Sequence, residues 1–110
     1  MKLKTLIESG EAEQLATGFQ FTEGPVWMPD RYLLFSDIPG NRINKWTEAG
    51  GMEVWREPSG NGNGLTHDRN GRLLACEHGN RRVSRTDADG TVTTLADTYQ
   101  GKRLNSPNDI

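Results

Sequence analysis

Tyr32-Leu33-Leu34-Phe35-Ser36-Asp37 and Arg72-Leu73-Leu74-Ala75-Cys76-Glu77 are two short runs that lie 40 residues apart in the sequence. An ungapped comparison at this offset aligns further residues along the chain. The matches are Gly24 with Gly64, Leu33-Leu34 with Leu73-Leu74, Asp37 with Glu77, Arg42-Ile43 with Arg82-Val83, and Gly50 with Gly90. Because they continue from one apolar run through a turn into the next, these matches indicate a structural repeat of about 40 residues.

Each repeat consists of short β-type runs separated by Gly, Asn, Asp and Pro. Arg42–Trp46 alternates polar and apolar residues, as a half-buried strand does. The pairs Asn70-Gly71 and Asp89-Gly90 are typical of tight hairpin turns. Four short strands in a unit of about 40 residues are typical of a β-propeller blade. The expected strands are 24–28, 32–37, 42–46 and 52–55 in the first blade, and 64–68, 72–77, 81–86 and 91–95 in the second.

The sequence therefore predicts an all-β fold, with blade one over about residues 23–57, blade two over about 63–97 and a third blade beginning at residue 108. Because a propeller closes with about four to eight blades, we expect residues 1–110 to be the N-terminal part of one propeller domain of roughly 250–300 residues. Gln14–Gly18 is expected to be an outer strand of the last blade. The chain alone is expected to be inactive and to aggregate, because its strand edges are uncovered.

Composition and charge exclude several classes of protein. The chain has 13 Lys and Arg against 15 Asp and Glu, so it lacks the basic excess of a nucleic-acid-binding protein. No apolar run approaches the roughly 20 residues that cross a bilayer. The apolar part of Met1–Ile7 is too short for a secretory signal, which indicates a cytoplasmic protein. A single cysteine, Cys76, excludes an internal disulfide and a Cys-based zinc cluster. The oligomeric state is left open.

The first strand of each propeller blade lines the central channel, so matched positions at the start of these strands form a ring around the axis. Glu23, Asn63 and Asn108 occupy this position, at offsets of 40 and 45 residues. All three carry hard oxygen donors, which favour calcium; magnesium and manganese are alternatives, and zinc fits less well. Asp37 and Glu77 also match each other, but we expect a structural role for this pair.

Antiparallel connectivity places the end of a blade's second strand on the same face as the start of its first. His78 follows the second strand of blade two and should therefore lie on the face that carries Glu23. The connection 101–107 lies on that face too, and it should bring Arg103 and Asn105 near the channel mouth. With Asn63, these three residues are our candidates for binding a substrate.

Three motifs, FTEGPVW at 21–27, CEHGNRRVSR at 76–85 and RLNSPND at 103–109, resemble the senescence-marker-protein/gluconolactonase/luciferin-regenerating-enzyme family, and its bacterial gluconolactonase-like branch in particular. The resemblance covers about residues 17–110. It implies a six-bladed propeller with one divalent cation in the channel, and hydrolysis of sugar-acid lactones such as gluconolactone. The first metal-binding glutamate of the family falls on Glu23, and an asparagine of its metal site falls on Asn108.

The implied mechanism is metal-assisted ester hydrolysis, with the general base expected beyond Ile110, so no catalytic base is assigned within the chain. Arg103, Asn105 and His78 would hold sugar hydroxyls or the developing oxyanion. Two alternatives stay open. The same metal site would serve a hydrolase of phosphotriesters or other esters, and the fold would also serve a non-catalytic binding or scaffold protein.

Overall fold

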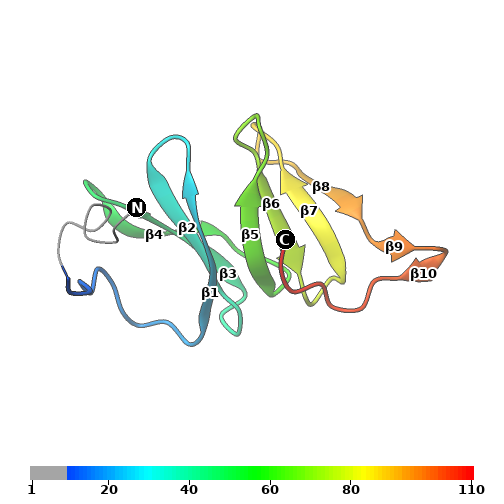
Figure 1. The fold of residues 1–110 in the computed structure, drawn as a ribbon, viewed down its shortest axis with the longest axis horizontal. Helices are drawn as coiled ribbons and strands as arrows, with labels where there is room; N and C mark the ends of the chain where they lie inside the picture. The colour runs from blue at the N-terminus through cyan, green and yellow to red at the C-terminus, as the bar shows by residue number, and fades with distance from the viewer. Residues whose placement is uncertain (1–9) are drawn as a thin grey trace.

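The computed structural model describes residues 10–110, which form two four-stranded antiparallel β-sheets lying side by side (Figure 1). Met1–Ile7, on which the interpretation of the N-terminus rests, lies outside the described residues. The described part of the chain contains no helix, and thus no helix long and apolar enough to cross a membrane. The all-β prediction is confirmed.

The first sheet is a simple meander in which each strand pairs with the next along the chain. Its turns place Arg31, Asn41 and Gly51 in the left-handed backbone region, with φ of 68°, 55° and 69°. Its strands are β1 (Thr22–Met28), β2 (Tyr32–Asp37), β3 (Arg42–Thr47) and β4 (Gly51–Arg56).

The second sheet repeats this meander. Gly71, Arg81 and Gly90 occupy the left-handed region in its turns, with φ of 75°, 56° and 87°. Its strands are β5 (Gly62–His67), β6 (Leu73–Glu77), β7 (Arg82–Thr86) and β8 (Val92–Ala96). All eight strands expected from the repeat are therefore present.

Two features differ from the expectation. The connection after β8 contains an additional small hairpin, β9 (Thr98–Tyr99) and β10 (Lys102–Arg103), which projects from the outer side of the second sheet in Figure 1. Gln14–Gly18 forms no strand. Its expected partner was a strand of the last blade, which the described chain does not contain, and the segment instead lies against the outer face of the first sheet.

The hydrophobic core lies between the two sheets. Strand alternation points one set of apolar side chains from each sheet into this space. Its buried members are Met28, Leu34, Ile43, Leu65, Leu73 and Ala75, and Val26, Tyr32 and Trp55 pack against them. The first strands of the two sheets, β1 and β5, are direct neighbours across this interface. This packing places the starts of β1 and β5 beside each other.

Candidate functional site

The starts of β1 and β5 are irregular in the same way. The register of β1 against β2 shifts between Glu23 and Val26, and that of β5 against β6 shifts between Gly62 and Leu65. Such bulges interrupt a ladder and redirect the side chains beside it, and they are frequent next to active sites. The two bulges lie at the starts of β1 and β5, beside each other. We call this end of the molecule the channel end.

Glycines allow the chain to approach itself closely at the channel end. Gly24 has a φ of +58°, and a Cβ there would collide with the carbonyl oxygen of Asn63. A Cβ on Gly64 would lie 2.8 Å from the carbonyl oxygen of Asn108. The Gly64 N–H donates to that same Asn108 oxygen at 2.8 Å. The backbones of β1, β5 and residues 108–110 are therefore adjacent in series, in the order that the repeat predicts.

The side chains of the three channel-end positions differ in exposure. Glu23 is exposed, and its Oε2 accepts only a hydrogen bond from the Gly24 N–H at 3.1 Å. Asn63 is buried, with its carbonyl oxygen accepting from Ser36 Oγ at 2.8 Å. Asn108 is exposed. Within residues 10–110 no hydrogen bond joins these three side chains, so the donor atoms of Glu23 and Asn108 are available to a ligand.

The other predicted residues lie at the same end. Exposed His78 is in the turn after β6, and the neighbouring Gly79 N–H donates to the Gly60 carbonyl at 2.8 Å, just before β5. Arg103 is exposed on β10, and its Nη2 donates to the Asn80 carbonyl at 3.4 Å. Asn105 is exposed in the connection that follows. We call His78, Arg103 and Asn105 the rim residues, and their role stays a prediction.

The matched acids Asp37 and Glu77 are fully buried, and each accepts hydrogen bonds or forms ion pairs at the end of its sheet. Asp37 accepts from the Phe21 N–H at 3.1 Å and pairs with Arg42 at 3.7 Å. Glu77 pairs with Arg82 at 2.9 Å in its own sheet and with Arg56 of the first sheet at 3.1 Å. The Arg56–Glu77 pair therefore joins the two sheets, and both acids have the structural role that was expected for them.

Burial acts to raise the pKa of Glu77, but hydrogen bonds from Asn80, Arg82 and Arg56 outweigh it and hold this pKa below its ordinary value of 4.5. A carboxyl with a lowered folded-state pKa stabilises the protein above the unfolded pKa, and this stability is lost as the pH falls below it. The ionised network should thus weaken in acid.

Glu77→Gln is expected to lower the free energy of unfolding of the full-length protein near pH 7 by about 3 kcal/mol, because it leaves two arginines without their buried partner. Its loss of stability below about pH 4.5 should be shallower than that of the unsubstituted protein. Urea unfolding between pH 3 and 7 measures both effects. Glu53→Gln, in the exposed Lys45–Glu53 pair, is the control and should change little. Identical acid profiles for Glu77→Gln and the unsubstituted protein would contradict the role of the network.

A divalent cation fits the channel end in chemistry but not in ligand number. The described residues contain no group of three or more His, Cys, Asp or Glu that could hold a metal. Glu23 offers one carboxylate and Asn108 one amide oxygen, both hard donors, whereas calcium takes about six to eight oxygen ligands. The types of donor would therefore suit a hard cation, but these two side chains are too few for a complete calcium site.

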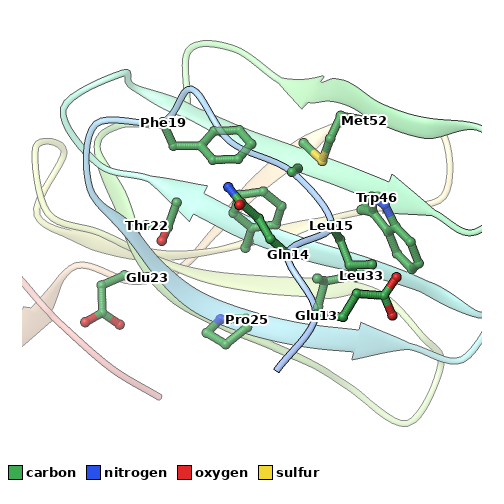
Figure 2. Close-up of a pocket in the computed structure, with 12 residues that line it drawn as sticks. Glu13, Gln14, Leu15, Phe19, Thr22, Glu23, Pro25, Leu33, Trp46 and Met52 are labelled. Atoms are coloured by element: carbon green, nitrogen blue, oxygen red, sulfur yellow. The ribbon is translucent and has the colours of Figure 1, made fainter. Parts of the chain in front are cut away.

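A cavity of about 490 Å³ lies on the other face of the first sheet (Figure 2). Phe19 of the N-terminal segment meets Phe35 edge to face there, with ring centroids 5.0 Å apart. Leu33, Trp46 and Met52 of the sheet complete most of the apolar wall. Figure 2 shows Glu23 at the edge of this cavity with its carboxylate pointing away from these side chains. Glu23 therefore lies at the border between this cavity and the channel end.

Comparison with known proteins identifies the family of this chain. The family described as SMP-30/Gluconolactonase/LRE-like region matches residues 21–110. The chain belongs to this family. The match begins at the FTEGPVW motif of β1 and includes every strand of both sheets.

Relatives of this SMP-30/gluconolactonase/LRE-like chain are gluconolactonases by name. A Zymomonas mobilis subsp. mobilis gluconolactonase is 34% identical over 113 residues, covering 89% of this chain and 32% of the relative. The solved structure of a Xanthomonas campestris gluconolactonase is 43% identical, with a TM-score of 0.79, covering 83% of this chain and 31% of that one. A second solved structure, assigned as a gluconolactonase within its protein family, is 41% identical, with a TM-score of 0.87, covering 98% and 39%. The chain thus spans about a third of their length.

Sequence reasoning missed the residues that fix the connections between strands. Asn41 accepts from the Asn61 N–H through Oδ1 at 2.8 Å, and Arg81 Nε donates to the Leu104 carbonyl at 2.8 Å. Positions 41 and 81 match at the 40-residue offset, but the residue types differ and neither was singled out. What the two residues share is their backbone conformation. Both adopt the left-handed region, which non-glycine residues rarely enter.

Proposed function

We propose that the full-length protein containing this chain is a metal-dependent hydrolase that opens sugar-acid lactones such as gluconolactone. The observation that carries the proposal is the succession of Glu23, Asn63 and Asn108 at one end of adjacent strands. The names of the relatives, which this chain covers over about a third of their length, support the same reaction.

In this proposal Glu23 and Asn108 are ligands of one divalent cation, with calcium first and magnesium, manganese or zinc as alternatives. The cation would supply Lewis-acid polarisation of the lactone carbonyl and activation of water. Glu23 acts as a ligand rather than as a base, because a carboxylate on a divalent cation stays ionised. Its single backbone hydrogen bond leaves the second carboxylate oxygen available for this task.

The rim residues His78, Arg103 and Asn105 would hold the sugar hydroxyls, and Asn63, at the bulge of β5, is the fourth candidate for binding the substrate. Arg103 uses one N–H on Asn80, and a guanidinium has five N–H donors, so most of its donors stay free. Hydrogen-bond donors fixed at the place where charge develops lower the barrier to acyl transfer. The general base would come from outside the described chain.

The proposal predicts that chelation removes activity reversibly. Hydrolysis of gluconolactone by the full-length protein, followed by acid release, should fall by about tenfold or more after treatment with EDTA. Added calcium should restore it. Absence of hydrolysis in the presence of calcium, magnesium, manganese or zinc would exclude the lactonase. Full activity after chelation would exclude the metal dependence.

A further inference from the structure

Two connections in the structure lead to channel-end positions. The first runs from the end of β4 to Asn63, and the second from the end of β8 to Asn108. The second is longer by five residues, since the repeat offset rises from 40 to 45 across it. In both cases the backbone carbonyl of the asparagine nevertheless lies against a glycine of the preceding inner strand. Asn63 lies against Gly24, and Asn108 lies against Gly64. The extra length must therefore be absorbed before residue 108.

The first connection is held by Asn41. Its backbone carbonyl accepts from the Ser59 N–H at 3.0 Å, and its side-chain Oδ1 accepts from the same N–H at 3.2 Å. Ser59 is fully buried and lies four residues before Asn63. Asn41 therefore fixes the chain at Ser59, four residues before Asn63 at the channel end.

The second connection is held at the equivalent place by Arg81. Arg81 Nε donates to the carbonyl of Leu104 at 2.8 Å, and Leu104 lies four residues before Asn108. The Leu104 N–H in turn donates to the Asp97 carbonyl at 2.8 Å, which closes the base of the β9–β10 hairpin. All the added residues thus lie on the far side of this contact, away from Asn108.

We propose that Arg81 is a positioning residue for the channel end: by clamping Leu104 it sets where Asn108 stands beside Gly64. The Arg81–Leu104 clamp does in the second blade what the Asn41–Ser59 contact does in the first. The polarity of the hydrogen bond is reversed, because a guanidinium donates to a carbonyl where the amide oxygen accepts from an N–H. The link between this clamp and metal binding rests on the proposed function.

The test uses Arg81→Met, which keeps much of the side-chain volume and removes the donor, and Arg81→Lys, which keeps a donor. In the full-length protein, Arg81→Met should raise amide exchange in peptides covering 60–66 and 101–108 by about tenfold, as expected for one lost charge-assisted hydrogen bond. It should weaken calcium affinity by a similar factor. Arg81→Lys should recover a large part of both effects.

Arg85→Met is the matched control, because Arg85 lies in the same sheet and pairs with Asp87 at 2.6 Å, away from the connection. It should leave both exchange in 101–108 and calcium affinity unchanged. Unaltered exchange in Arg81→Met would overturn the clamp. Raised exchange with unaltered calcium affinity would overturn its link to the metal. A protein that binds none of calcium, magnesium, manganese and zinc before substitution would refute the proposed metal site, and the exchange data would still decide on the clamp.

Discussion

Replacing Glu23 by Gln in the full-length protein is expected to lower calcium affinity and gluconolactone turnover by about tenfold or more. The substitution preserves shape and removes the carboxylate of Glu23, which is proposed as a ligand of the cation at the channel end. Folding should be nearly unaffected, because the side chain is exposed and an amide oxygen can still accept from the Gly24 N–H. Calorimetric calcium titration and steady-state hydrolysis measure the two effects separately.

Glu53→Gln is the matched control for this substitution. Glu53 is an exposed acid on β4, paired with Lys45 at 3.6 Å on an outer strand. It undergoes the same chemical change with no expected effect on calcium or turnover. If Glu23→Gln binds calcium and hydrolyses gluconolactone like the unsubstituted protein, the assignment of Glu23 as a ligand is wrong.

Gly24→Ala is expected to lower the free energy of unfolding by about 3–4 kcal/mol and to abolish calcium binding at the channel end. The left-handed backbone of Gly24 accounts for about 1–2 kcal/mol of this loss. The remainder reflects the collision of the new Cβ with the carbonyl of Asn63 and the N–H of Leu65, which are backbone atoms and cannot rotate away. Urea unfolding and calcium titration of the purified protein measure the outcome.

Gly51→Ala separates the two contributions to this loss. Gly51 has a similar φ of +69°, but no atom lies within 4 Å of a Cβ built there. Its replacement should therefore show only the backbone cost, about 1–2 kcal/mol. Equal losses in the two variants would show that the close approach of β1 and β5 is not a constraint on the channel end.

The repeat predicts most of the fold because the information it uses is local. Asn70-Gly71 and Asp89-Gly90 provide turns, and the alternation of residues such as 42–46 selects the buried face. In the structure Gly71 and Gly90 adopt the positive φ that these pairs indicate. Comparison at a fixed offset then locates equivalent strands in the two sheets, so β2 (Tyr32–Asp37) has the bounds that were expected.

The β9–β10 hairpin was missed because its signal is weak. Its two-residue turn, Gln100-Gly101, has positive φ at both positions, 51° and 78°. Such a turn usually carries Asn or Asp followed by Gly, and Gln gives no such indication. Gln14–Gly18 forms no strand here for a different reason, and its pairing with the last blade stays a prediction. Its strand prediction required a partner outside the chain, and in the described residues the segment packs by its apolar side chains instead.

The sequence predicted where the candidate site residues lie, but not which side chains hold the connections that lead to them. Offsets of 40 and 45 residues were sufficient to place Glu23, Asn63 and Asn108 at one end. Offsets carry no information on which side chains hold the connections, because Asn41 and Arg81 perform equivalent tasks with opposite hydrogen-bonding chemistry. Asn41 and Arg81 resemble each other only in their left-handed backbone conformation, which cannot be read from the two residue types.

The β9–β10 hairpin projects from the outer side of the second sheet, upstream of the contact between Arg81 and Leu104. Chain length can therefore change within the hairpin without shifting the register of the ring. The turn at Gln100-Gly101 is thus a suitable insertion point: a peptide tag or a longer loop inserted there should leave Asn63 and Asn108 in their positions. Chain length can thus vary in the hairpin, whereas Gly24 and Gly64 of the inner strands leave no room for a side chain.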